Sequence, residues 1–116
     1  MLKYINTLML STLKENAKEF LDSGNDNLKK ERNNAAISDF FKTTVILADY
    51  KIYEQLKILP KNHNHRFELL EKYFPKIYSK TSNLFKKYRD SYNNKTSKED
   101  AIKVKEYAEQ LLKTIN

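Results

Sequence analysis

The stretch ERNNAAISDFFKTTVILADYKIYEQLKILP, residues 31–60, decides the fold of this chain. After a predicted turn at Arg32–Asn34, largely apolar residues recur every three or four positions, and the helix must end before Pro60. The stripe comprises Ile37, Phe40, Phe41, Thr44, Val45, Ala48, Ile52 and Leu56, with Leu47 and Tyr50 beside it. A helix that is apolar over so much of its circumference contacts several neighbours. We therefore expect this stretch to form the central helix of the core.

The sequence before this stretch predicts one more long helix. From Ile5 onward, apolar residues again recur at three and four positions, so we expect a helix that runs to about Lys30. The segment DSGND, residues 22–26, is the strongest helix breaker in the first half of the chain. We expect it to weaken the helix near Gly24 without ending it.

The sequence after Pro60 predicts three further helices. A short helix follows the polar turn, with Asn62 or Asn64 as its N-cap, and Pro75 fits the first turn of the next helix. Ser97 and Asp100 match a capping box at the start of the last helix, which continues close to the end of the chain.

The composition agrees with an all-α fold. The 116 residues include one glycine and two prolines, far fewer turn residues than a sheet protein needs. A chain of this length has room for one modest core, so residues 1–116 are expected to form a single domain. The predicted architecture is an antiparallel up-and-down bundle of four long helices plus one short helix.

The sequence also excludes several classes of site. The chain has no cysteine, which rules out disulfides, zinc–thiolate sites and cysteine nucleophiles. The apolar opening of the chain is interrupted by charged residues, so it predicts neither a signal peptide nor a membrane span. We expect a cytoplasmic protein without a membrane interaction or a cofactor.

The net charge of +7 has two interpretations. It can provide a surface for RNA or another polyanion, or the lysines can simply solvate the helices of a Lys- and Asn-rich chain. Only three basic residues are arginines, Arg32, Arg66 and Arg89, and these carry more information than any single lysine.

Arg89 and Tyr92 are the first candidates for a functional site. They lie in YRDSYNNKTSKEDAIKVKEYAEQLL, residues 88–112, where Arg89 borders the apolar face of its helix. A guanidinium in that position needs acceptors, so one interpretation is a phosphate contact. The other is a salt bridge to Asp39, Asp49 or another acid on the central helix.

A second set of candidates comprises His63, His65, Arg66 and Asp39. The spacing of the histidines could place both imidazoles on one side of an extended loop, where a phosphate contact is plausible. No suitable third ligand lies nearby in the sequence, so we expect no metal site, and helix capping remains the alternative. Asp39 is either a site residue or a first-turn carboxylate that complements the helix dipole.

Three of these segments together resemble the HEPN superfamily (higher eukaryotes and prokaryotes nucleotide-binding), especially its small prokaryotic and archaeal single-domain members. Residues 33–56 resemble its central helix, residues 59–74 (LPKNHNHRFELLEKYF) its Lys-x-His loop and short helix, and residues 88–112 its Arg-x-x-Tyr segment and final helix. The resemblance covers about residues 28–115. It implies an all-α fold, a homodimer with a shared cleft, and a nucleotide, RNA or nucleotidyltransferase antitoxin as partner.

Many HEPN proteins are metal-independent ribonucleases with an Arg-x4-6-His motif, in which the histidine moves protons and the arginine holds phosphate charge. Arg89 matches that arginine. The matching histidine would fall at Asn94, Lys95 or Thr96, and none of these carries an imidazole. The resemblance with this departure implies a protein that binds rather than cuts.

Three hypotheses follow for the function. The first is a HEPN-type binding protein that recognises RNA, a nucleotide or a nucleotidyltransferase partner, without efficient catalysis. The second is a ribonuclease toxin of a toxin–antitoxin pair that uses Arg89 with Tyr92, His63 or His65. The third is a structural interaction module whose lysines only increase solubility.

Overall fold

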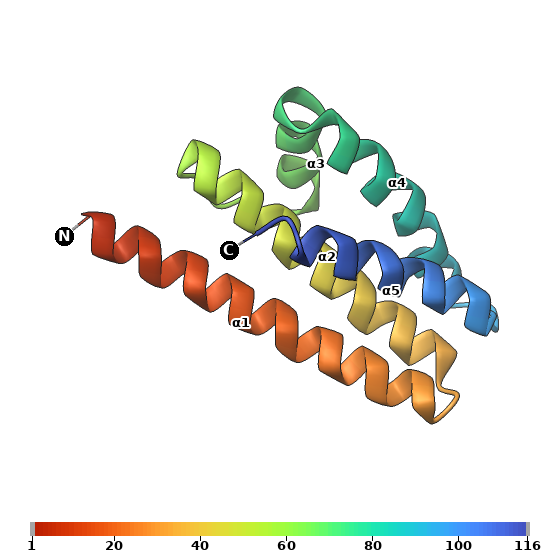
Figure 1. The fold of residues 1–116 in the computed structure, drawn as a ribbon. Helices are drawn as coiled ribbons and strands as arrows, with labels where there is room; N and C mark the ends of the chain where they lie inside the picture. The colour runs from red at the N-terminus through yellow and green to blue at the C-terminus, as the bar shows by residue number, and fades with distance from the viewer. Residues whose placement is uncertain (1, 116) are drawn as a thin grey trace.

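The structure is a computed structural model that describes residues 2–115. The all-α prediction is confirmed, since these residues form five helices, with turns and loops between them and no strand. Figure 1 shows the helices, which are α1 (Leu2–Lys29), α2 (Asn33–Leu56), α3 (His63–Tyr73), α4 (Pro75–Asp90) and α5 (Lys98–Leu112).

Helix α2 is the central element, as its apolar stripe predicted. It contacts each of the other four helices. Its buried residues are Ala36, Ile37, Phe40, Phe41, Thr43, Thr44, Leu47, Ala48, Tyr50, Ile52 and Tyr53. Figure 1 shows α1 lying along α2 with the chain running in the opposite direction, while α4 and α5 cover other parts of α2. The core therefore forms around one helix.

Helix α1 is continuous through Gly24, so the prediction of one long first helix is confirmed. Gly24 is buried, and a Cβ atom at this position would overlap the ring of Phe40 on α2. The glycine is therefore explained by packing, because only a residue without a side chain lets Phe40 lie directly on the backbone of α1.

The turn between α1 and α2 lies earlier than predicted. Asn33 and Asn34 already belong to α2, and the turn centres on Glu31, whose φ of 59° is left-handed. The N–H of Arg32 donates to the carbonyl oxygen of Asn27 at 2.9 Å, a bond typical of a Schellman helix end. The prediction placed the turn too late because glutamate is not the usual residue for this conformation.

The predicted helix starts after Pro60 are present. The side chain of Asn62 accepts from the backbone N–H of His65 at the start of α3, and Pro75 begins α4. The Ser97 hydroxyl accepts from the backbone N–H of Asp100 and caps α5. The Asp100 carboxylate also accepts from the Lys87 ammonium at 3.0 Å, which ties α5 to α4.

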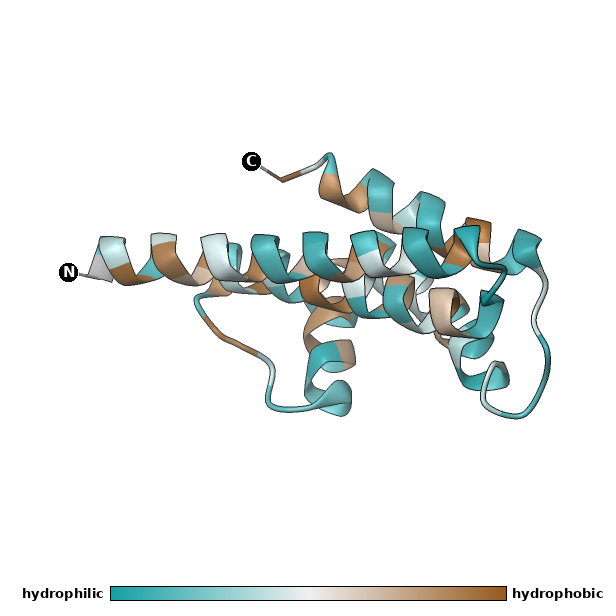
Figure 2. Ribbon diagram, turned by 90° about the horizontal axis from the view of Figure 1, so that it is seen from below, coloured by the Kyte–Doolittle hydropathy of each residue, from teal (hydrophilic) through white to brown (hydrophobic). Residues whose placement is uncertain are grey.

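The N-terminal part of α1 extends beyond its neighbours (Figures 1 and 2). Brown, hydrophobic residues recur on this part of the helix in Figure 2. Tyr4, Ile5 and Leu8 are 70%, 47% and 53% exposed, so the helix presents apolar side chains that the described residues do not cover.

No helix within residues 2–115 has both the length and the apolar character that crossing a membrane would require.

Candidate functional site

Rings from α2, α3, α4 and the turn after α4 form one continuous group, here called the aromatic cluster, which comprises Phe41, His63, Phe67, Tyr78, Phe85, Tyr88 and Tyr92. Phe85 lies at its centre. The rings of Phe41, His63, Phe67 and Tyr88 have their centroids between 5.7 and 6.1 Å from the Phe85 centroid. Such distances are typical of favourable aromatic pairs, so α4 is held against α2 and α3 largely through these rings.

The cluster reaches the surface through two tyrosines. Tyr88 stacks on the buried ring of Phe41, with the centroids 4.8 Å apart and the planes at 10°. Its hydroxyl shares a hydrogen bond of 2.7 Å with that of Tyr92, whose side chain is 71% exposed. The hydrogen bond with Tyr92, followed by burial, raises the pKa of Tyr88 above its ordinary value. The Tyr88 phenol is therefore neutral at physiological pH and is a poor general base.

Arg89 lies at the exposed edge of this cluster. Its Cζ atom is 5.8 Å from the centroid of Phe85, in a cation–π arrangement. Within residues 2–115, no carboxylate forms an ion pair with it. The predicted salt bridge to Asp39 or Asp49 is therefore wrong, because hydrogen-bond donors on other helices already occupy both of these carboxylates.

Asp49 is paired with Arg66, which joins α2 to α3. The guanidinium donates from Nε to Oδ1 at 2.6 Å and from Nη2 to Oδ2 at 2.9 Å. The two side chains are only 12% and 14% exposed. This two-point geometry is the one that arginine forms best with a carboxylate, and it fixes the position of the guanidinium.

The same guanidinium determines the protonation of His63. The Arg66 Nη1 atom lies 2.9 Å from His63 Nδ1. A guanidinium only donates, so Nδ1 must be the acceptor and the hydrogen of the neutral ring lies on Nε2. Burial, followed by the charge of Arg66, lowers the pKa of His63 below its ordinary value, with Asp49 opposing in part. His63 is therefore a neutral donor at physiological pH, with no free ring nitrogen to accept a proton.

The two histidines do not form a joint site. Both lie within α3 rather than in an extended loop, and residues two positions apart on a helix face different sides. His65 Nδ1 accepts from the backbone N–H of Lys61 at 3.0 Å, and its own N–H donates to Asn62. The expectation of two imidazoles on one side is therefore wrong, whereas the alternative of helix capping is confirmed for His65.

Asp39 lies apart from the aromatic cluster, at the contact between α1 and α2. One of its carboxylate oxygens accepts from the Ser23 hydroxyl at 2.8 Å and from the Asn27 amide at 2.9 Å. It is not in the first turn of α2, so the predicted role in complementing the helix dipole there is wrong. Its observed contacts bind the two longest helices to each other.

Asn34 organises the loop between α4 and α5, a role that the sequence did not indicate. Its amide donates to the carbonyl oxygens of Ser91 and Asn94 at 2.9 and 2.8 Å. Its carbonyl oxygen accepts from the backbone N–H and the hydroxyl of Thr96. These partners lie about 60 positions away in the chain, so no local pattern could have identified them. The loop after Arg89 is therefore fixed by an asparagine from α2.

A pocket of about 240 Å³, here called the α2 pocket, lies beside Tyr88. Its lining residues are Phe20, Phe41, Lys42, Val45, Ile46, His63, Arg66 and Tyr88. Lys42 lies over the ring of Phe20, with its ammonium 5.3 Å from the centroid. An apolar floor, stacked rings and a cationic rim thus meet on one side of the aromatic cluster.

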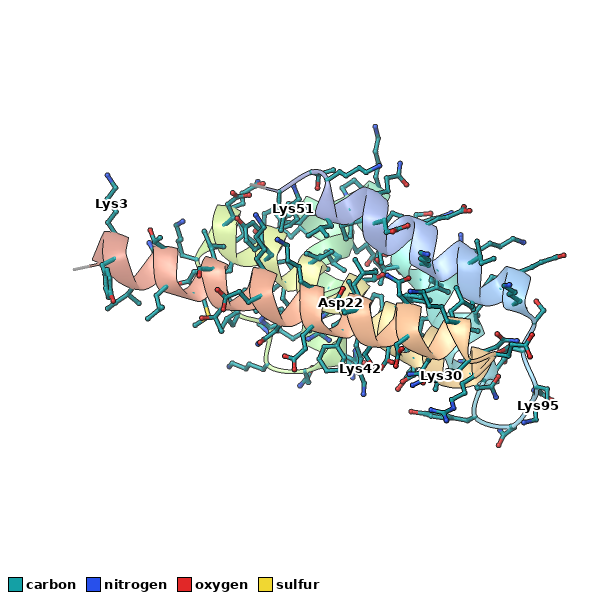
Figure 3. All side chains as sticks on the ribbon, turned by 60° about the horizontal axis from the view of Figure 1, so that its bottom comes forward. Lys3, Asp22, Lys30, Lys42, Lys51 and Lys95 are labelled. Atoms are coloured by element: carbon teal, nitrogen blue, oxygen red, sulfur yellow. The ribbon has the colours of Figure 1, made fainter. Side chains whose placement is uncertain are left out.

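The described part of the chain brings no three histidine, aspartate or glutamate side chains together as a metal ion would need. The basic charge is also spread widely, since Figure 3 shows Lys3 near one end of the molecule and Lys95 at the other. The chemistry of the site is therefore that of exposed rings, a guanidinium and a single imidazole donor.

The structure thus brings together four of the residues that the sequence singled out, namely His63, Arg66, Arg89 and Tyr92, and separates His65 and Asp39 from them. Comparison of the chain with protein-family models, with curated proteins and with solved structures gives no match.

Proposed function

We propose that this chain is a HEPN-type binding protein that holds RNA or a nucleotide on the surface formed by the aromatic cluster and Arg89. One observation carries the proposal. Arg89 is an exposed guanidinium without a carboxylate partner among residues 2–115, and it lies over Phe85, whose neighbour Tyr88 contacts the exposed Tyr92. An unpaired arginine beside an exposed aromatic ring matches the two parts of a nucleotide, the phosphate and the base.

The energetics favour single-stranded nucleic acid over a duplex. Stacking a base on an exposed ring contributes about 1–3 kcal/mol per base and requires a base that is not already paired. A charge-assisted hydrogen bond from Arg89 to a phosphate adds further affinity and is sensitive to salt. Arg89 is in the last turn of α4 and Tyr92 is in the turn that follows, with its N–H donating to the carbonyl oxygen of Arg89 at 3.2 Å, so one nucleotide can contact both.

Binding without efficient cleavage follows from the acid–base groups. Attack of a 2′-hydroxyl on the adjacent phosphate needs a base to remove a proton and an acid to return it. The loop after Arg89 has Asn94, Lys95 and Thr96 where the HEPN motif has histidine, and Thr96 is hydrogen-bonded to Asn34. His63 has its Nδ1 occupied by Arg66, and the Tyr88 phenol is neutral.

The proposal includes the bundle and the compartment that the sequence predicts and the partners that the resemblance implies. Helices of 28, 24, 16 and 15 residues against one of 11 residues support four long helices plus one short helix in an antiparallel bundle. A homodimer would bring two copies of Arg89 to a shared cleft in the cytoplasm. A nucleotidyltransferase antitoxin is the candidate protein partner.

Replacement of Arg89 by alanine tests this function. We expect the melting temperature to remain nearly unchanged, because the side chain is exposed and forms no ion pair within the described residues. RNA binding, measured by fluorescence anisotropy at low salt, should weaken by about ten- to a hundredfold, the usual effect of losing a charge-assisted contact. Arg89→Lys should recover only part of the affinity, since lysine lacks the two-point geometry.

Lys76→Ala is the matched control, because it removes the same charge from the exposed surface at the other end of α4. A structural interaction module would bind RNA weakly and lose equally little affinity with either substitution. Analysis of the RNA after incubation separates binding from cleavage, and cyclic phosphate ends that disappear in Arg89→Ala would establish a ribonuclease instead.

A further inference from the structure

The α2 pocket has an interior that favours a planar ring as its ligand. Phe41, which is only 2% exposed, and Tyr88, which stacks on it, both line the pocket. Val45 adds an aliphatic wall, so the interior offers flat and apolar surface. A planar ring fits such a space better than a flexible chain does, since it gains stacking without losing internal freedom.

The size of the pocket limits how much of a ligand can enter it. Pockets that enclose a whole drug-sized molecule have volumes of about 300–1,000 Å³. The α2 pocket, with about 240 Å³, holds one ring system and leaves the rest of the molecule outside. A nucleobase meets this requirement, because its sugar and phosphate extend away from the ring.

The rim supplies groups for both parts of a nucleotide. Lys42 lies at the surface beside α1 (Figure 3) and forms no ion pair within residues 2–115. It can therefore contact a phosphate outside the pocket. Arg66 is held by Asp49 and contributes by fixing His63 rather than by binding the ligand itself.

His63 is the only histidine that lines the α2 pocket, and the contact with Arg66 fixes its tautomer. Asp49 holds Arg66 at two points, and Arg66 in turn donates to His63 Nδ1. This chain of contacts leaves Nε2–H as a donor that has no partner among the described residues. Since His63 lines the α2 pocket and its tautomer is fixed, Nε2–H is available to an acceptor atom on the edge of a ring that enters the pocket.

We propose that the α2 pocket receives one unpaired base of the bound RNA or nucleotide, and that His63 donates from Nε2 to a carbonyl oxygen or ring nitrogen of that base. The inference rests on the proposed function, to which it adds a hydrogen bond that recognises the base. Arg89 and Tyr92 hold the backbone and an adjacent base outside the pocket, whereas His63 contacts the base within it.

The test compares a short fluorescein-labelled oligouridylate with an abasic oligomer of the same length, using fluorescence anisotropy. His63→Phe keeps a ring of similar size but removes the donor, so binding of oligouridylate should weaken by about tenfold. Binding of the abasic oligomer should not change, because it has no base to contact Nε2. His63→Gln keeps an N–H donor and should recover most of the affinity for oligouridylate.

His65→Phe is the control, because His65 lies on another side of α3 and does not line the pocket. It should leave the ratio of the two affinities unchanged. Thermal melting monitored by circular dichroism checks that each variant is folded, and a chemical-shift change of the His63 ring on addition of uridine monophosphate provides a second readout in the wild-type protein.

The outcomes separate the two proposals. If Arg89→Ala weakens binding while His63→Phe has no effect, the pocket inference is overturned and the proposed function stands. If His63→Phe weakens the binding of oligouridylate and of the abasic oligomer equally, the inference is also overturned, because the effect would not depend on a base. If neither substitution weakens binding of either oligomer, both proposals fail.

Discussion

At the scale of single residues, the function depends on which side chains are already engaged by a partner. Arg66 and Arg89 look alike in the sequence, but Arg66 is bound to Asp49, whereas Arg89 lies over the ring of Phe85 and forms no ion pair within residues 2–115. A guanidinium held by a carboxylate positions its neighbours, and one without a carboxylate can take a phosphate. His63 and His65 both use Nδ1 as an acceptor, from the Arg66 guanidinium and from the backbone N–H of Lys61, and they differ in that His63 lines the α2 pocket whereas His65 does not.

The lowered pKa of His63 gives a prediction about pH. The unfolded chain takes up a proton on His63 near the ordinary pKa of 6.5, whereas the folded protein does so only at lower pH. In that interval the unfolded state binds more protons, so the free energy of unfolding decreases as the pH falls from 6.5 through the lowered pKa. Above pH 6.5 His63 is neutral in both states, so the free energy of unfolding no longer changes with pH through this group.

Nuclear magnetic resonance of the histidine Cε1–H groups should give a His63 midpoint below 6.5. His63→Gln assigns the signal and removes this part of the pH dependence of urea unfolding. A midpoint at or above the ordinary value would show that the Arg66 contact does not hold the ring neutral in solution.

The Asp49–Arg66 pair gives a prediction about stability. Arg66→Ala would leave the Asp49 carboxylate largely buried without its partner, which should reduce the free energy of unfolding by about 2–4 kcal/mol. Arg32→Ala, which removes an exposed arginine from the turn before α2, should change it by less than about 0.5 kcal/mol. Urea unfolding of the two variants makes the comparison, and similar small effects would mean that the pair contributes nothing to the fold.

At the scale of the helices, local sequence patterns predicted most of what is observed. Asn62, Pro75 and Ser97 begin their helices as expected, because capping depends on atoms within one turn. The turn before α2 was predicted too late in the chain, because its central residue, Glu31, gives no local signal for the left-handed conformation that it adopts. A left-handed glutamate is uncommon, and here it is stabilised by the hydrogen bond between Arg32 and Asn27 rather than by its own preference.

The contact between α1 and α2 gives a prediction about Gly24. In an exposed helix, replacing glycine by alanine stabilises by up to about 1 kcal/mol. Here the added methyl group would overlap the ring of Phe40, so Gly24→Ala should instead destabilise by about 1–3 kcal/mol. Thermal unfolding with circular dichroism measures the change.

Two further variants isolate the cause. Asp22→Ala, at an exposed position on the same helix, should have little effect on unfolding. Gly24→Ala combined with Phe40→Leu should lose less stability than the sum of the two single changes, because the smaller side chain makes room for the methyl group. Additive effects would show that the two residues are not in contact.

At the scale of the whole molecule, two regions are exposed in a way that a second copy could cover. One is the end of α4 with Arg89 and Tyr92, and the other is the N-terminal part of α1 with Tyr4, Ile5 and Leu8. These regions lie toward opposite ends of the molecule (Figure 1). A two-fold dimer uses the same patch on both copies, so only one of them can surround the axis of a closed dimer.

We expect a homodimer through the α4 end, which brings the two Arg89 side chains to one cleft. Size-exclusion chromatography with light scattering should give the mass of two chains at high micromolar concentration. Tyr92→Glu should shift the mass toward one chain, and Leu8→Glu, a matched change at the α1 end, should not. A monomeric wild-type protein would contradict the dimer, and dissociation by Leu8→Glu alone would place the interface at α1.

The sequence by itself determined the helices, their order, the central position of α2 and the place of Arg89 at the border of the apolar face of its helix. These follow from apolar spacing and capping, which operate within a few residues of each other. Only the tertiary structure decided that Asp49 belongs to Arg66, that Asn34 fixes the loop after Arg89, that Phe40 requires Gly24 and that His63 is a donor. The partners on different helices are brought together only when the core packs, and the periodicity of one helix contains no information about which polar side chain on another will reach it.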